Sequence, residues 1–160
     1  MYANVLYLSR QYQRTIEYCQ WALSFAPRAE GLQFWLARAY ADQSRLPEAI
    51  EGMESARATD PRRGTGFGVL PGLYARTGRR GDAVRFVDGI LELAKSRYVS
   101  PVSVAIGYLG IGDLDRAFAW LEKGCLERDF SLSALKVDPI YDPIRADPRF
   151  QSLLQRLNLQ

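Results

Sequence analysis

The chain has 160 residues, of which 48% are hydrophobic and 24% are charged, and it contains no histidine. This length is enough for one folded core, and the lack of histidine excludes Ser-His-Asp and Cys-His catalytic sites as well as every metal site that uses histidine. The net charge of +3, from 21 basic and 18 acidic residues, is too balanced to indicate a protein that binds nucleic acid or a membrane surface.

Two further features bear on where the chain works. Cys19 and Cys125 are far apart and form no CxxC motif, so we expect two reduced thiols in the core, as is typical of the cytoplasm. No window reaches the roughly 18 consecutive apolar residues of a membrane span, and Met1 is followed by a helical pattern without a basic start or a cleavage site. We therefore expect a cytoplasmic chain with no membrane partner.

A period of 34 residues runs through residues 1–131. Its clearest columns are Tyr40, Tyr74 and Tyr108, and then Ala49, Ala83 and Ala117. Such a period predicts one helix pair per copy, in which small residues let two helices approach and tyrosines fill the space between pairs. In chain order, the predicted helices are 2–9, 12–25, 30–42, 46–58, 65–77, 80–95, 101–111 and 114–128. Turns are predicted at Arg10, Ser44, Gly78 and Gly112, and the two glycines suit a left-handed conformation.

The residues at these columns resemble the tetratricopeptide repeat family. The best copy, residues 30–63, contains Leu36, Ala37, Tyr40, Ala49, Met53, Ala56 and Pro61 at the family's spacings, and the fourth copy contains Val104, Ala105, Tyr108, Ala117 and Leu121. The resemblance implies an all-α, right-handed solenoid of antiparallel helix pairs in a single domain, 1–160. It would hold about four repeats, at 1–29, 30–63, 64–97 and 98–131, and a C-terminal cap at 132–160.

The resemblance also implies a binding surface, because in the family the first helix of each pair lines a concave groove that holds an extended peptide or a partner helix. Carried over by register, the groove-facing positions are Asn4, Tyr7, Leu8, Phe34, Arg38, Asp42, Gly68, Gly72, Arg76, Val102, Ile106 and Leu109. We expect Arg38 and Arg76 to point into solvent there. The Lys and Asn pattern with which chaperone-binding members hold a C-terminal carboxylate is absent, which argues against a chaperone-tail partner.

The first copy is incomplete, since the register places its start five residues before Met1. A shortened helix that carries Val5, Leu6 and Leu8 is a poor cap for a helical stack. We therefore expect either a piece of a longer protein or an exposed apolar end that pairs with another molecule, including a second copy of the chain.

The segment between the second and third copies offers two motifs. Gly64-Thr65-Gly66-Phe67-Gly68 completes neither GxGxxG nor a Walker motif, so we interpret it as a loose entry to the third repeat, whose first helix Pro71 should weaken. The basic cluster of Arg62, Arg63, Arg76, Arg79 and Arg80 could hold phosphate or carboxylate, or could simply be solvated. A nucleic-acid partner is not expected, because the cluster is short and lacks interleaved exposed aromatics.

The C-terminal part begins with Asp-Pro pairs. Asp138, Asp142 and Asp147 each precede a proline, which predicts helix N-caps and not calcium ligands, because their spacing fits no calcium loop. After the last pair, Phe150, Leu153, Leu154 and Leu157 form a helical stripe that should cover the apolar end of the fourth pair. The string from Leu135 to Phe150 resembles the tail that closes repeat regions in large bacterial regulators.

Together these features predict a protein–protein interaction scaffold that binds a peptide or partner helix in its groove, without a catalytic residue, a metal or a cofactor. The alternative is a self-associating regulatory or sensor segment of a larger bacterial signalling or transcription-regulatory protein.

Overall fold

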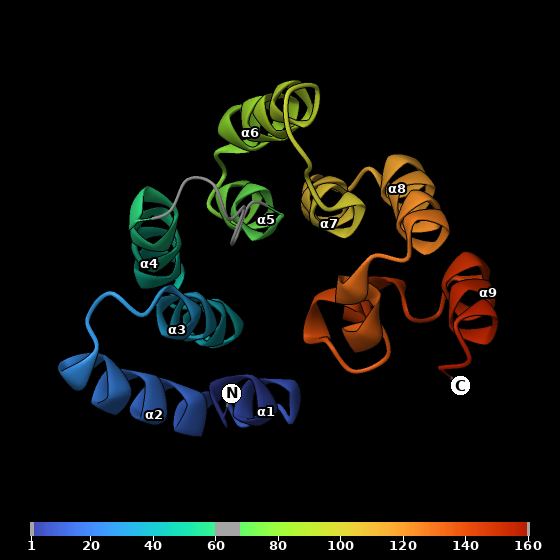
Figure 1. The fold of residues 1–160 in the computed structure, drawn as a ribbon. Helices are drawn as coiled ribbons and strands as arrows, with labels where there is room; N and C mark the ends of the chain where they lie inside the picture. Colours follow the sequence, from blue (N-terminus) through green and yellow to red (C-terminus); the bar gives the residue numbers. More distant parts are fainter. Residues whose placement is uncertain (1, 60–67, 160) are drawn as a thin grey trace.

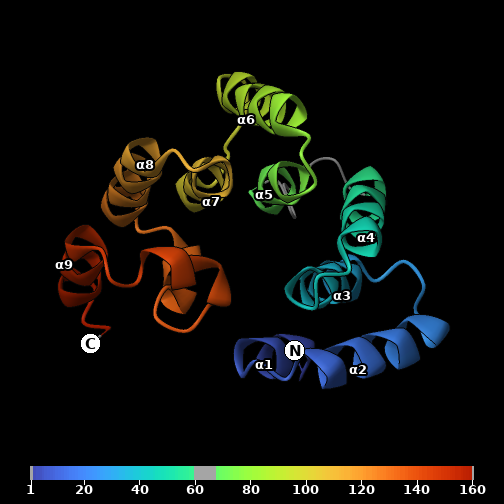
Figure 2. The same ribbon diagram turned by 180° about the vertical axis from the view of Figure 1, so that it is seen from behind.

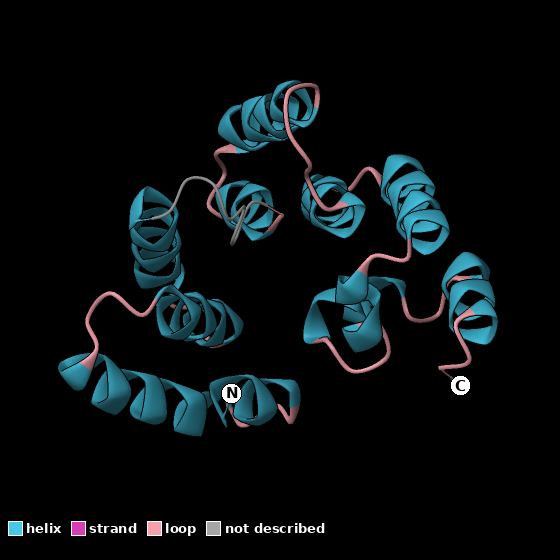
Figure 3. Ribbon diagram, in the orientation of Figure 1, coloured by secondary structure: helices cyan, strands magenta, loops and turns pink. Residues whose placement is uncertain are grey.

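The computed structural model describes residues 2–59 and 68–159, and these residues form helices joined by short loops, with no strand among them (Figure 3). The α-helices are α1 (Tyr2–Leu8), α2 (Tyr12–Phe25), α3 (Glu30–Asp42), α4 (Leu46–Thr59), α5 (Val69–Arg76), α6 (Arg80–Ala94), α7 (Pro101–Ile111), α8 (Leu114–Glu127) and α9 (Pro148–Arg156). Two 3-10 helices, η1 (Phe130–Ala134) and η2 (Pro139–Ile144), lie between α8 and α9. None of the helices described has both the length and the apolar character needed to cross a membrane.

Each helix from α1 to α8 packs against the next one along the chain, and α5 also packs against α7. The row of helices bends into an arc, with α3, α5 and α7 on its inner side and α4, α6 and α8 on its outer side (Figures 1 and 2). The segment that holds η1 and η2 lies inside the bend, opposite α1 and α3. The inner side of the arc therefore faces the C-terminal part of the same chain.

The four predicted turns are confirmed, and they share one geometry. Arg10, Ser44, Gly78 and Gly112 all have left-handed backbone conformations, with φ of 60°, 62°, 80° and 81°. After each turn the next residue donates its N–H to a carbonyl oxygen in the helix before it, at 2.8–3.0 Å; the accepting residues are Leu6, Tyr40, Tyr74 and Tyr108. These bonds satisfy carbonyls that a helix end otherwise leaves unpaired. The same turn thus recurs at intervals of 34 residues.

The columns of the 34-residue period lie in the core. Tyr40, Tyr74 and Tyr108 are 9%, 7% and 3% exposed, and Ala49, Ala83 and Ala117 are fully buried or nearly so. Small side chains let neighbouring helices approach, while each tyrosine keeps its hydroxyl near polar groups at the edge. Tyr74, for example, donates a hydrogen bond of 2.6 Å to Glu54.

The observed helix ends agree with the predicted ones to within about two residues, with one exception. The helix predicted at 65–77 is α5, which begins at Val69 and follows Gly68. Residues 64–67 of the predicted loose entry lie outside the described residues, as do Arg62 and Arg63 of the basic cluster. The predicted weakening by Pro71 was wrong in its physical reason: Pro71 is the third residue of α5, where a backbone N–H has no partner within the helix, and it is buried.

The predicted burial of the apolar stripe of α9 is confirmed. Phe150, Leu153 and Leu154 of α9 are buried in one cluster with Phe118 and Leu121 of α8. The Asp147 carboxylate accepts a 2.9 Å hydrogen bond from the N–H of Arg149 and begins α9, and Asp138 caps η2 in the same way through Ile140. Leu157 is partly buried at the edge of the cluster.

The predicted cap at Asp142 was wrong. Asp142 lies within η2, and its carboxylate binds the guanidinium groups of Arg10 and Arg145. The contact with Arg10, at 2.7 and 2.8 Å, joins the turn after α1 to the C-terminal segment. The tail is therefore more than an end cap, because it also ties the two ends of the arc together.

Candidate functional site

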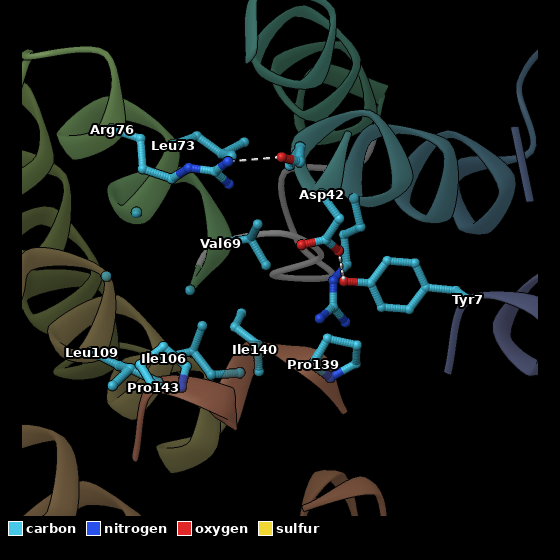
Figure 4. Close-up of a pocket in the computed structure, with 15 residues that line it drawn as sticks. Tyr7, Asp42, Val69, Leu73, Arg76, Ile106, Leu109, Pro139, Ile140 and Pro143 are labelled. Atoms are coloured by element: carbon cyan, nitrogen blue, oxygen red, sulfur yellow. Dashed lines mark hydrogen bonds between the residues drawn. The ribbon is translucent and has the colours of Figure 1, made fainter. Parts of the chain in front are cut away.

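A pocket of about 300 Å³ lies on the inner side of the arc, between α3, α5, α7 and η2 (Figure 4). Its apolar wall is formed by Val69, Leu73, Ile106, Leu109, Pro139, Ile140 and Pro143. Its polar side is formed by Tyr7, Arg38, Asp42 and Arg76. Such a mixture, with a few polar groups around an apolar surface, is typical of sites that bind a ligand and fix its orientation.

A second pocket of about 450 Å³ adjoins the first, because Arg38, Gly68, Val69 and Ile106 line both. Its other walls come from α1, α3, α7 and the segment that holds η1 and η2, and they include Asn4, Leu8, Phe34, Trp35, Val102, Phe130, Val137 and Tyr141. The side-chain oxygen of Asn4 is buried and accepts no hydrogen bond from the described part of the chain. The inner side of the arc thus contains two adjoining pockets.

All twelve groove-facing positions named above line one or both pockets, Leu8, Gly68, Gly72 and Leu109 among them. Tyr7, Arg38, Asp42, Arg76 and Ile106 line the smaller pocket, and Asn4, Phe34 and Val102 line the larger one with Arg38 and Ile106. The structure therefore brings these side chains together from α1, α3, α5 and α7. It does not open them to solvent equally, since Tyr7 and Val102 are only 2% and 1% exposed.

The expectation that Arg38 points into solvent was wrong. Arg38 is 5% exposed, and its guanidinium makes two hydrogen bonds, of 2.9 and 2.5 Å, to the carboxylate of Asp138. The same guanidinium lies 4.4 Å from the ring centre of Tyr7 and 5.3 Å from that of Trp35. An acidic residue that lies 100 positions later in the chain covers Arg38, so Arg38 forms the floor of the site and is not a free cation.

Burial and charge act in opposite directions at this floor. Burial is the largest single influence and disfavours the charged guanidinium of Arg38, but the charge of Asp138, the hydrogen bonds to it, and the neighbouring Tyr7 and Asp42 together outweigh burial. The pKa of Arg38 is therefore raised and the group stays protonated. Burial also raises the pKa of Tyr7, which donates a hydrogen bond of 2.5 Å to Asp42. Both groups therefore keep their protons at neutral pH and act as donors, not as bases.

Asp42 and Arg76 provide the exposed charges at the rim. Arg76 donates a 2.8 Å hydrogen bond to the carbonyl oxygen of Ala41, in the last turn of α3, where a cation is favoured by the helix dipole (Figure 4). The expected solvent exposure of Arg76 is confirmed. Of the two arginines proposed for the groove, Arg76 alone can meet an incoming group without disturbing the core.

Two glycines let α5 and α7 approach closely beside the smaller pocket. A Cβ atom placed on Gly110 would lie 2.6 Å from both the Cα and the nitrogen of Gly72, which is closer than real side chains come. Both glycines line the pocket. The width of the hollow between these helices therefore depends on the absence of two side chains.

Sequence reasoning missed the part of the site that comes from η2. Pro139, Ile140 and Pro143 close the smaller pocket from the side opposite α3 and α5. Pro139 and Pro143 belong to Asp-Pro pairs, and such pairs predict local helix caps but not a pocket wall. Nothing in the neighbouring residues indicates that Asp138 would pair with Arg38 or that Asp142 would pair with Arg10.

Neither pocket is lined by a cysteine. The described residues contain no group of three or more His, Cys, Asp or Glu side chains able to hold a metal ion. Cys19 is buried, and burial raises the pKa of its thiol to about 11; burial also raises the pKa of Cys125, so neither is an activated nucleophile.

The chain was compared with protein-family models and with curated proteins. No family model matches it, and no curated protein matches it.

Proposed function

We propose that the chain is a tetratricopeptide-like recognition module that binds a short segment of another protein on the inner side of its helical arc. The observation that carries the proposal is the convergence of the twelve groove-facing positions, from α1, α3, α5 with its N-cap Gly68, and α7, on two adjoining pockets. The family assignment is supported by the recurrence of one turn geometry every 34 residues.

The size of the hollows argues for a short ligand. Volumes of about 300 and 450 Å³ are in the lower part of the range of small-molecule and cofactor sites, so they accommodate a few side chains and not a long helix. The C-terminal segment also occupies part of the inner side, since η2 lines both pockets and η1 lines the larger one. The bound segment would thus insert two or three apolar side chains between α3, α7 and η2.

The charges at the rim set the polar preference. Asp42 is exposed and negative, Arg76 is exposed and positive, and both lie at the smaller pocket. A ligand with apolar anchors and one charge of each sign, or with backbone groups that hydrogen-bond to both, fits this rim better than a purely acidic or basic segment.

The experiment is a selection of random peptides displayed on phage against the purified chain, followed by fluorescence anisotropy with each selected peptide. Ile106→Trp fills space that borders both hollows, and Leu126→Trp is the matched control, because Leu126 is 80% exposed on α8 and lines neither hollow. We expect Ile106→Trp to weaken binding at least about tenfold, which corresponds to ~1.4 kcal/mol, and Leu126→Trp to leave it unchanged. Selected peptides that bind both variants as tightly as the original chain would refute the proposal.

A further inference from the structure

One end of the helical row carries an uncovered aromatic surface. Tyr2 and Val5 of α1 are 50% and 56% exposed, and Trp21 and Phe25 of α2 are 62% and 76% exposed. Tyr18 joins them: ring centres are 5.0 Å apart between Tyr2 and Tyr18, 5.9 Å between Tyr18 and Trp21, and 5.5 Å between Trp21 and Phe25. We name these five residues the N-terminal aromatic face.

In the later copies of the 34-residue period, the residues equivalent to Tyr2 and Val5 are buried or partly buried. Steps of 34 and 68 residues from Tyr2 lead to Leu36, which is partly buried, and to Leu70, which is fully buried. The same steps from Val5 lead to Ala39 and Leu73, which are 0% and 2% exposed. In those places α2 packs on α3 and α4 packs on α5. Tyr2 and Val5 are therefore exposed at positions whose counterparts in the later copies are buried or partly buried.

Trp21 adds a second and independent observation. The positions 34, 68 and 102 residues after it hold Ser55, Gly89 and Lys123, all exposed. On α4, α6 and α8 this side of the helix is thus small or polar, as expected for a surface in water. On α2 the same side carries the largest apolar side chain, continuous with Tyr18 and Phe25. Tryptophan and tyrosine are the residues most enriched at the centres of protein interfaces.

The opposite end of the row is closed. The buried stripe of α9 covers α8, and the outer side of α9 presents the exposed polar residues Gln151, Ser152, Gln155 and Arg156. A second copy stacked head to tail with α9 on α1 would place these polar side chains against Tyr2 and Val5, which is unfavourable. The matching apolar surface is the N-terminal aromatic face itself, which is uncharged and so does not repel a second copy.

We infer that the N-terminal aromatic face is a self-association surface, through which two copies of the chain form a symmetric, head-to-head dimer. A closed dimer follows, and not a filament, because a two-fold axis uses the same face on both copies. The inference does not depend on the pockets of the inner side, whose residues are separate from the face.

The size of the face sets the strength of the dimer. With about 200 Å² for a fully exposed aromatic side chain, the face buries on the order of 450 Å² per copy, below the roughly 800 Å² per partner of a stable complex. A dissociation constant in the micromolar range is therefore expected, and the experiment must extend to about 200 μM.

The test is sedimentation equilibrium of the full chain between about 1 and 200 μM, where the mass should rise from 18.1 kDa toward twice that value. Trp21→Glu combined with Phe25→Glu should raise the dissociation constant more than about 100-fold, because each change occurs twice in a symmetric dimer. The matched control is Tyr98→Glu with Leu126→Glu, which changes two side chains that are 72% and 80% exposed outside the face, and it should dimerise as before.

Circular dichroism separates association from folding. Since Trp21 and Phe25 are largely exposed, the double variant should keep the helical signal and the unfolding midpoint of the monomer. A chain that stays monomeric to 200 μM, on the scale of the weak dissociation constants expected here, would overturn the inference. So would a dimer that survives Trp21→Glu with Phe25→Glu, because its contacts would then lie elsewhere.

Discussion

The buried pair of Arg38 and Asp138 allows a sharp test of how the C-terminal segment is held. Asp138→Asn removes the negative charge but keeps an oxygen that can accept the N–H of Ile140 and so preserves the start of η2. The side chains of Arg38 and Asp138 are 6% and 11% exposed, so the guanidinium would remain in the interior without its counter-charge. We expect Asp138→Asn to be strongly destabilising.

The magnitude follows from the surroundings of Arg38. Removing one partner of a buried ion pair costs about 3–5 kcal/mol. The lower end applies here, because the guanidinium keeps its contact with the ring of Tyr7 and can still donate to the new amide. For a domain of this size, about 3 kcal/mol lowers the melting temperature by roughly 6–12 °C.

The assay is urea and thermal unfolding followed by circular dichroism, with Arg10→Ala as the control. Arg10 and Asp142 are also paired at 2.7 Å, but their side chains are 50% and 39% exposed, so the loss should be about 0–1 kcal/mol. Arg38→Met combined with Asp138→Asn should lose less free energy of unfolding than the two single changes added together. Equal effects of Asp138→Asn and Arg10→Ala would refute the reasoning, because they would place the Arg38 pair in solvent.

Three other changes test the packing and the acid response. Tyr74→Ala should lower the free energy of unfolding by about 3 kcal/mol or more, and Tyr74→Phe by about 1 kcal/mol, in urea titrations. Gly110→Ala should destabilise by about 1–3 kcal/mol because its Cβ meets the backbone of α5, whereas Gly89→Ala, whose Cβ meets nothing within 4 Å, should stabilise slightly. The hydrogen bond from Arg10 lowers the pKa of Asp142 to about 2. The contribution of the Asp142 carboxylate to the free energy of unfolding is therefore present above pH ~4 and is lost as the pH falls toward 2. Asp142→Asn should therefore flatten the decline of the urea midpoint across that interval.

The helices, their turns and their buried faces could be predicted from the sequence, because they depend on residues that are close together in the chain. Tyr40, Tyr74 and Tyr108 follow a fixed period, and helix pairs with short turns repeat that period in space. Gly78 and Gly112 indicated left-handed turns, and the register predicted turns at Arg10 and Ser44 as well. The left-handed conformation of Arg10 and Ser44 was not predicted, because their side chains do not favour it. The stripe of α9 indicated its buried face in the same way.

The candidate site could be predicted only in part. The resemblance to the tetratricopeptide family implied which helices line the groove, and the register carried the groove-facing positions over to α1, α3, α5 and α7. It could not show which of those positions stay open, since this depends on what covers them. The register predicted that Arg38 and Arg76 would both point into solvent. Arg38 is buried against Asp138, whereas Arg76 is exposed.

What the sequence by itself determined is therefore the set of helices, their turns and the residues of their buried faces, all of which arise from interactions within about 34 positions. Only the tertiary structure decided the path of residues 130–144 into the inner side of the arc, the pairing of Arg38 with Asp138 across 100 positions, and the closure of the pockets by η2. The physical reason is that a charge pair between distant segments leaves no periodic trace in the sequence. The curvature of the whole row of helices brings such residues together.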